Sequence, residues 1–475
     1  MLDFAAGYIA GKWVGDGNRI AVTSPASGEV LGSVATAGPT DVDAAVGAAR
    51  TALQSSPWRD ATPADRGAAL GRLADALTAR KAQLADLATA EIGSPRSWST
   101  FGQVLTATGV LKSYAAIAPD YPFESTRPSL TGGTVHVRQV PVGVVGAIIP
   151  WNTPLFIAAL KLGPALAAGC TVVMKPAPDA PLGLCLLAEA IEEAALPDGV
   201  VNIVNGGAAT GQALTAHRGV DKISFTGSTA VGSQIAVACG ADLRRCSTEL
   251  GGKSAAIVLD DAPLESTAAG LVGGVMGNNG QLCAALTRIL LPHSRYDEFV
   301  DALTCAVSKL AVGDPADRST DVGPVINEAA RDRIEGFLQR ATLDGAAILT
   351  GGRRPPGPGW YVAPTVVGAD NDIEIAREEL FGPVAVVIGY RDDDEAVAIA
   401  NDSRYGLVGA VWSADDDRAA AVAARLRTGS VAVNSSAVLD FGSPFGGFKQ
   451  SGIGREGGPE GIAGFIEYQT IIRRP

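Results

Sequence analysis

The chain has 475 residues, of which 47% are hydrophobic and 19% are charged, and its net charge at pH 7 is -12. This length predicts two or three domains with ample apolar material for a large core. The acidic balance argues against partners such as nucleic acid or an anionic membrane surface. Because no apolar run approaches the roughly 20 residues of a membrane span, and no basic n-region precedes an apolar stretch, we expect neither a span nor a signal peptide.

The cysteines and histidines argue against disulfides and metal sites. There are six cysteines, none in a CxxC pair, and three histidines. Scattered cysteines and so few histidines lack the spacing of a zinc or disulfide framework. We therefore expect free thiols, a cytoplasmic location and no metal.

The first 120 residues are predicted to be largely helical after a short start. Apolar residues recur at helical spacing over 41–53, 64–77 and 81–90. The chain then turns polar and Pro-rich, and the alternating valines of 134–140 predict a hairpin or an extended excursion from the main body.

From residue 142 onward, short apolar β-branched runs alternate with helical segments. Strands are expected at 142–149, 171–174, 200–204 and 223–225, and helices at 155–168, 182–195, 211–217 and 230–238. This alternation is typical of a parallel sheet built from βαβ units, an α/β architecture of the dinucleotide-binding, Rossmann-like type.

A second α/β region follows without a linker, so we expect two tightly packed lobes. Its strands are predicted at 255–259, 287–291 and 385–390, its helices at 264–276, 296–310 and 331–341, and an extended end at 465–472.

A glycine-containing turn joins one predicted strand to the next helix, in Phe225-Thr226-Gly227-Ser228 with Gly232 further on. A glycine there lets backbone N–H groups approach a pyrophosphate, and the helix N-terminus favours the negative charge. Taken alone the signal is weak, because most such turns only cap a helix.

Six further segments strengthen this interpretation. They are Ile149-Pro150-Trp151-Asn152, Lys175-Pro176, Glu249-Leu250-Gly251-Gly252-Lys253, Gly280-Gln281-Leu282-Cys283, Glu378-Glu379-Leu380-Phe381-Gly382-Pro383 and Pro444-Phe445-Gly446-Gly447-Phe448-Lys449. In this order they resemble the aldehyde dehydrogenase superfamily, of the hydrolytic NAD(P)-dependent type, from about Trp13 to the C-terminus.

The resemblance implies a domain plan and an assembly. It assigns 1–121 and 141–248 to a Rossmann-like cofactor domain, 249–450 to a catalytic domain with the nucleophile, and 122–140 and 451–475 to an oligomerisation hairpin and C-terminal strand. A homodimer or homotetramer is expected.

The resemblance also implies a mechanism in which Cys283 attacks the aldehyde carbonyl and later carries a thioester. The Asn152 amide and the Cys283 N–H would hold the oxyanion, Glu249 would activate the hydrolytic water, and Glu456 would lie on the proton path. From residue type alone, Cys283 could be a small buried hydrophobe and Asn152 a helix cap.

The cofactor is expected to be NAD or NADP. The resemblance places around it Ile149, Pro150, Trp151, Lys175, Gly211, Phe225, Gly227, Ser228, Val231, Gly232, Leu250, Glu379 and Phe381. Many NAD-preferring relatives carry a glutamate three residues after the lysine, where this chain has Pro178 followed by Asp179. Because that carboxylate would repel a 2′-phosphate, its loss leaves NADP use open.

The substrate is expected to be an apolar aldehyde, either aromatic, terpenoid or medium-chain. The positions that would line its tunnel are uncharged, although some could simply fill the core; they are Thr153, Phe156, Ile157, Leu160, Leu282, Leu439 and Phe445. Two alternatives remain open: an acylating semialdehyde dehydrogenase that passes the thioester to coenzyme A, and a non-catalytic protein that retains the fold. Relatives of the acylating type generally lack the base at the position of Glu249.

Overall fold

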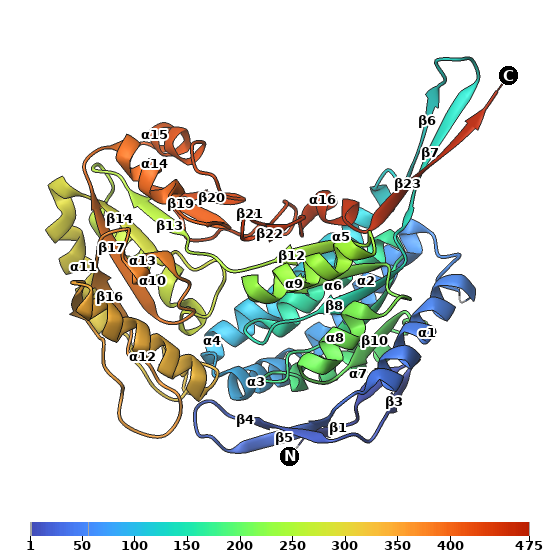
Figure 1. Cartoon of the computed structure of the whole chain (residues 1–475), viewed down its shortest axis with the longest axis horizontal. Helices are drawn as coiled ribbons and strands as arrows, with labels where there is room; N and C mark the ends of the chain where they lie inside the picture. Colours follow the sequence, from blue (N-terminus) through green and yellow to red (C-terminus); the bar gives the residue numbers. More distant parts are fainter. Residues whose placement is uncertain (1, 56, 475) are drawn as a thin grey trace.

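The computed structural model describes residues 2–55 and 57–474 of the chain. Figure 1 shows two α/β lobes side by side and a narrow β arm that projects from the first lobe and carries the C-terminus. The expected α/β architecture with a Rossmann-like parallel sheet is confirmed.

Within the described residues, the first lobe is built on an eight-stranded sheet of order β22-β12-β11-β8-β9-β10-β2-β3. The strands are β2 (Gly7–Ile9), β3 (Lys12–Val14), β8 (Val144–Ile148), β9 (Thr171–Lys175), β10 (Val201–Val204), β11 (Lys222–Thr226), β12 (Arg245–Glu249) and β22 (Gly452–Ile453). From β12 to β10 all neighbours are parallel. The chain runs outward from β8 to β10 and then returns to β11 on the other side of β8, which makes the β8/β11 boundary a topological switch point.

Helices cover both faces of this sheet. Their bounds are α1 (Pro39–Ser55), α2 (Pro63–Ala79), α3 (Lys81–Ile92), α4 (Arg96–Trp98), α5 (Thr106–Asp120), α6 (Pro154–Ala168), α7 (Leu182–Glu193), α8 (Ala208–Ala216) and α9 (Thr229–Ala241). One core cluster joins α2, α5, α6 and α7, and a second joins α1, α8 and α9. All 15 residues of α6 are buried, so this helix forms the centre of the lobe.

The second lobe contains a seven-stranded sheet in the described part of the chain, of order β15-β16-β17-β14-β13-β19-β20. The strands are β13 (Ala255–Val258), β14 (Arg288–Pro292), β15 (Ala347–Thr350), β16 (Thr365–Gly368), β17 (Val384–Tyr390), β19 (Val408–Trp412) and β20 (Ser430–Val433). Except for antiparallel β15, all neighbours are parallel. Core clusters place α10 (Leu264–Met276) and α11 (Tyr296–Ser308) on one face, and α12 (Glu328–Leu343), α14 (Asp393–Asn401) and α15 (Asp416–Ala423) on the other.

The predicted hairpin and the extended C-terminal segment form one small sheet. Strands β6 (Glu124–Pro128), β7 (Thr134–Pro141) and β23 (Ile466–Arg473) are ordered β23-β7-β6, and β23 runs antiparallel to β7. This sheet is the arm in Figure 1. Tyr468 and Ile472 on β23 are 65% and 63% exposed, which is unusual for such large apolar side chains.

The N-terminal region differs most from the prediction. The three helices expected there are present as α1, α2 and α3, but five short strands precede them: β1 (Leu2–Phe4), β4 (Arg19–Thr23) and β5 (Val30–Ala35) form a separate sheet, while β2 and β3 extend the main one. A π-helix, η1 (Ser99–Leu105), continues into α5.

Strands β12, β16, β19 and β20, further along the chain, were also not expected. None of the helices in the described ranges is long and apolar enough to cross a membrane.

Four further short elements lie in the second half of the chain. They are α13 (Glu374–Arg377), β18 (Tyr405–Gly406), β21 (Phe448–Lys449) and α16 (Gly458–Ala463). Strand β22 pairs with β12, so residues 452–453 belong to the first sheet although they follow the second lobe in the chain. The predicted domain limits stay a prediction, since the lobes exchange segments here.

Candidate active site

Four parallel strands of the first sheet end at the same level. Ile148 at the end of β8 pairs with Lys175 of β9, and its neighbour β11 pairs Thr226 with Glu249 of β12. Carboxyl ends of parallel strands at a switch point are where ligands bind in open α/β sheets. The structure therefore brings Lys175, the Gly227 turn, Glu249 and the segment after Ile148 to one edge.

The Gly227 turn leads into the 13-residue helix α9. The Ser228 hydroxyl accepts a hydrogen bond of 3.4 Å from the Val231 N–H, which caps the helix. A Cβ on Gly232 would lie 2.4 Å from Leu250 Cδ2, so only glycine lets α9 pack this closely on the segment after β12. The first-turn N–H groups of α9 that its cap leaves free suit an anionic group.

Cys283 is half-buried and follows a turn of unusual backbone. Asn278, Asn279 and Gly280 have φ angles of 50°, 60° and 71°, a left-handed run that is costly for non-glycine residues. The Asn279 amide donates to the carbonyls of Gly93 and Pro324, both at 2.8 Å, and its oxygen accepts from the Gly323 N–H at 2.7 Å. This buried amide holds the turn, and thus Cys283, against both lobes.

Asn152 faces the same turn from the first lobe. Its side-chain nitrogen donates to the Gln281 carbonyl at 2.8 Å, and its main-chain carbonyl accepts from the side chains of Gln103 and Asn278 at 3.0 and 3.1 Å. An amide NH₂ carries two donor hydrogens, so one remains for a further acceptor. Gln103 and Asn278 were not identified from the sequence, where nothing links them to Asn152.

Glu249 and Cys283 lie in a desolvated environment. Glu249 is 4% exposed, and neither carboxylate oxygen has a hydrogen-bond partner among the described residues. Burial, followed by the charge of Glu456, raises the pKa of Glu249 well above its ordinary value. Burial raises the pKa of the Cys283 thiol to about 12, and the carboxylates of Glu379 and Glu249 add to the effect. The thiol is therefore protonated at neutral pH, and burial favours the neutral form of the Glu249 carboxyl.

A buried ion pair lies behind Glu249. Lys161 Nζ on α6 is 2.7 Å from Glu456 Oε1, and both side chains are almost completely buried. The Lys161 amine also donates to the Ser224 hydroxyl at 3.2 Å, which in turn accepts from Ser247 at 3.3 Å. The sequence analysis missed Lys161, although a single lysine inside an otherwise apolar helix was a usable signal.

Further predicted cofactor residues come from both lobes and contact one another across them. Lys175 is 5% exposed, its amine donates to the Pro176 carbonyl at 2.6 Å, and burial lowers its pKa to about 8. Phe381 has a left-handed φ of 60° and its ring contacts Trp151 edge-on, with centroids 5.4 Å apart. Glu379 accepts from the Gly252 N–H at 3.2 Å, whereas Glu378 pairs with Arg404 at 2.6 Å.

The predicted tunnel residues fall into two groups. Phe156, Ile157 and Leu160 on α6 belong to the core of the first lobe, and Phe445 to that of the second. Thr153 precedes α6 and is buried, Leu282 is half-buried beside Cys283, and Leu439 is 39% exposed. Their role in binding an aldehyde stays a prediction.

Comparison with known proteins decides the family. Residues 13–471 match the aldehyde dehydrogenase family. The chain is 45% identical over 467 residues to a geranial dehydrogenase of Castellaniella defragrans, with 98% of each chain covered.

The chain belongs to the aldehyde dehydrogenase family.

Two solved structures are similar over almost the whole chain. An aldehyde dehydrogenase of Mycobacterium tuberculosis complexed with NAD⁺ has a TM-score of 0.97 at 42% identity, covering 99% of this chain and 98% of that one. The NAD⁺ complex of an aldehyde dehydrogenase of Bacillus cereus has a TM-score of 0.96 at 35% identity, covering 99% and 96%. This aldehyde dehydrogenase is therefore an oxidoreductase that oxidises aldehydes with NAD or NADP. Its described residues contain no cluster of three or more His, Cys, Asp or Glu side chains that could hold a metal.

The Asn279 network predicts a large effect of Asn279→Ala. Loss of the amide leaves two carbonyls and one N–H without their partner in a buried site, so we expect destabilisation of about 3 kcal/mol and a lower kcat. Asn434→Ala is the matched control, because Asn434 also has a left-handed φ, of 51°, but is exposed. Chemical denaturation measures both; equal effects would contradict the proposed importance of the network.

Proposed function

We propose that this enzyme oxidises apolar aldehydes to carboxylic acids through a covalent Cys283 thioester that is hydrolysed by water activated by Glu249. The observation that carries the proposal is the convergence of these two side chains at one edge, with Gly252 between them: a Cβ on Gly252 would lie only 2.7 Å from the Cys283 carbonyl. A nucleophile and a base held close to the same short backbone segment suit acyl transfer to water.

Cys283 acts as the nucleophile in this scheme. Before the attack its thiol transfers its proton to water or to the Glu249 carboxylate, a step that burial opposes by raising the pKa of the thiol. The attack forms a C–S bond and moves the carbonyl electrons onto oxygen. The free N–H of the Asn152 amide and the Cys283 main-chain N–H are the donors available to that oxyanion. When bound, NAD(P)⁺ supplies a positively charged ring that accepts the hydride.

Glu249 acts as the base in the second half of the reaction. Its unpartnered oxygens are free to accept a proton from water, and the water oxygen then attacks the thioester carbon while the Cys283 sulfur leaves. Only the ionised carboxylate can do this, so the raised pKa makes hydrolysis faster as the pH rises through it. A coenzyme A acylating enzyme has no need of such a base, which disfavours that alternative.

Glu456 and Lys161 offer an exit for the proton. The second carboxylate oxygen of Glu456 has no partner among the described residues, and its charge acts on Glu249. The proton can therefore pass from Glu249 to Glu456, whose other oxygen is held by Lys161. Burying such an ion pair costs more than it contributes to stability in many proteins, so its presence beside the base favours a functional role.

The residues at the sheet edge fit a dinucleotide. The N-terminus of α9 and the absence of a side chain at Gly227 leave backbone donors for the pyrophosphate. The buried Lys175 amine, which donates to the Pro176 carbonyl, would bind the adenosine ribose, and a side chain added at Gly211 would approach that lysine to 3.4 Å. Glu379 would hold the nicotinamide ribose beside Phe381.

The proposed substrate class rests on the uncharged walls and on the geranial dehydrogenase relative, whose name denotes a terpenoid aldehyde. The residues predicted for the tunnel carry no charge that could neutralise a dicarboxylic semialdehyde. A homodimer or homotetramer is also proposed, because the exposed apolar side chains of β23 and the arm present an uncovered strand edge.

The two-step scheme predicts a burst of NADH in Glu249→Gln. Acylation and hydride transfer proceed, releasing about one equivalent per site, but steady turnover falls about 10²–10⁴-fold because the base is lost. Stopped-flow absorbance at 340 nm measures both phases. Cys283→Ala should show neither phase, and Cys305→Ala, at an exposed free cysteine, should behave as wild type. Wild-type turnover by Glu249→Gln would contradict the scheme.

The substrate proposal predicts a preference for long apolar aldehydes. We expect kcat/KM to rise from butanal to octanal, by up to about 0.8 kcal/mol per methylene group buried. Succinic semialdehyde should be roughly 100-fold poorer than octanal, because its carboxylate would be buried without a partner. Initial rates across this panel test the proposal, and a preference for the semialdehyde would refute it.

The loss of a carboxylate at Pro178 predicts comparable use of both cofactors. We expect kcat/KM for NAD⁺ and NADP⁺ to lie within about ten-fold of each other, and Pro178→Glu to weaken NADP⁺ by at least about ten-fold through repulsion of its 2′-phosphate. Initial rates with each cofactor measure this. A strong loss with NADP⁺ in the wild type would show that another group rejects the phosphate.

A further inference from the structure

Lys253 is a buried lysine that the mechanism above does not use. It is 2% exposed, and its amine has no hydrogen-bond partner among the described residues. Burial, reinforced by the charges of Arg288 and Arg333, lowers the pKa of this amine to about 7, while Glu379 and then Glu378 oppose the shift. Burying an ammonium group without a partner costs free energy, and a function for this lysine would explain its presence here.

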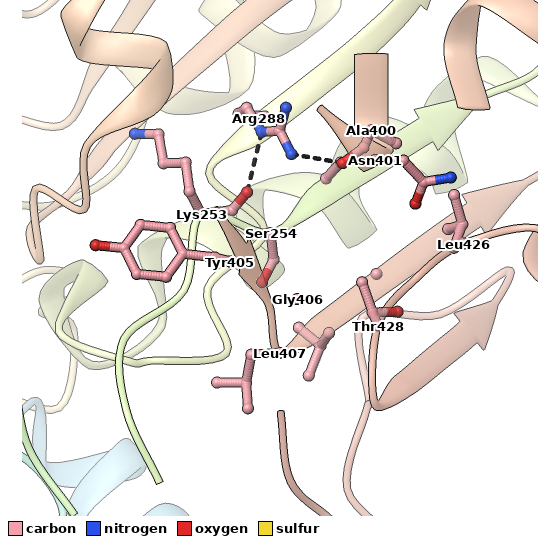
Figure 2. A pocket seen from close by; sticks show the side chains of 13 residues that line it. Lys253, Ser254, Arg288, Ala400, Asn401, Tyr405, Gly406, Leu407, Leu426 and Thr428 are labelled. Atoms are coloured by element: carbon pink, nitrogen blue, oxygen red, sulfur yellow. Dashed lines mark hydrogen bonds between the residues drawn. The ribbon is translucent and has the colours of Figure 1, made fainter. Parts of the chain in front are cut away.

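The main chain of Lys253 is fixed by a second buried cation. Arg288 Nε donates to the Lys253 carbonyl at 3.0 Å, and its other nitrogens donate to Asn371 and to the carbonyls of Ile399 and Ala400. Figure 2 shows the Lys253 side chain leading away from Arg288, with the amine at the far end. The cavity lined by these residues measures only about 10 Å³, room for at most one water.

The Glu379 carboxylate, whose charge acts on the Lys253 amine, belongs to the proposed cofactor site. Glu379 rests on the two glycines that precede Lys253: the Gly252 N–H donates to its Oε1 at 3.2 Å, and a Cβ on Gly251 would lie 2.2 Å from its Oε2. Burial raises the pKa of Glu379 to about 7, and Arg333, Lys253 and Arg404 oppose this.

The other charges in this neighbourhood are already engaged. Arg404 pairs with Glu378 at 2.6 Å, and Arg333 donates to the main-chain carbonyls of Leu380 and Glu379 at 2.8 and 2.6 Å. Lys253 is the cation here that lacks a partner in the described part of the chain.

We propose that Lys253 is a positioning residue that provides the counter-charge of Glu379 and keeps that carboxylate ionised and oriented toward the cofactor. The inference rests on the proposed role of Glu379 as the acceptor for the ribose hydroxyls. An ionised carboxylate accepts hydrogen bonds from both hydroxyls of a vicinal diol, whereas a protonated one has lost part of that capacity. Removing the ammonium therefore weakens cofactor binding through Glu379.

Titration of each variant with NADH, followed by cofactor fluorescence, tests this without requiring turnover. We expect Lys253→Met to raise the Kd about ten-fold, the usual scale for a lost charge-assisted interaction. Lys253→Arg, which keeps the charge, should restore most of the affinity. In a Glu379→Gln background, Lys253→Met should change the Kd by less than about two-fold, because the lysine then has no charge to balance.

Lys222→Met is the matched control. Lys222 is also buried, with a pKa lowered by burial to about 8, but its amine lies 4.9 Å above the Phe465 ring. It should bind NADH as wild type does. If Lys253→Met does not fold, as judged by circular dichroism and thermal denaturation, Lys253→Gln takes its place.

The outcomes separate the two proposals. Wild-type affinity in Lys253→Met, or an equal loss in the Glu379→Gln background, overturns the role of Lys253 while leaving Glu379 intact. An unchanged Kd in Glu379→Gln alone overturns the role of Glu379, and the inference on Lys253 with it.

Discussion

The passage of the chain from the first sheet to the second is the constraint on which the site depends. Five residues, Leu250 to Ser254, separate the end of β12 at Glu249 from the start of β13 at Ala255. In this short crossing Gly251 and Gly252 lie against Glu379 and the Cys283 carbonyl so closely that a side chain would collide with either. One short backbone segment thus sets the spacing of the proposed base, the proposed nucleophile and the proposed ribose acceptor.

The crossing also explains why so much charge is buried around it. Glu249 and Glu456 are buried and Glu379 is half-buried, and in such surroundings like charges raise one another's pKa and each ionised group needs a counter-charge. Lys161 forms an ion pair with Glu456, and we propose that Lys253 provides the counter-charge of Glu379. Glu249 has neither an ion pair nor a hydrogen bond among the described residues. An ionised carboxylate without a partner does not stabilise a buried site, and in the proposed mechanism its oxygens accept a proton from water.

The sequence analysis succeeded where local pattern reflects local structure. Strands such as β8, β9 and β11 are apolar and lie between amphipathic or apolar helices. The alternation of strands and helices could therefore be predicted, and with it the position of the residues at the strand ends. It failed for β12, whose residues Arg245 to Thr248 are mostly polar, and for the three-residue strands near the N-terminus, which carry too little periodicity. The contacts of Asn279 with Gly93 and of Lys161 with Glu456 span 186 and 295 residues, and no local pattern encodes them. Cys283 and Glu249 were identified through motifs that resemble those of a family. From local residue patterns alone, both side chains could have had a purely structural role.

The central claim is that the reaction passes through an acyl group on Cys283 that Glu249 helps to remove. The most direct measurement is intact-protein and peptide mass spectrometry of Glu249→Gln, quenched in acid shortly after mixing with octanal and NAD⁺. The account predicts a mass increase of one octanoyl group, located on the peptide that contains Cys283 and absent when NAD⁺ is omitted. An unmodified protein that has nonetheless released NADH, or an octanoyl group on another residue, would contradict it.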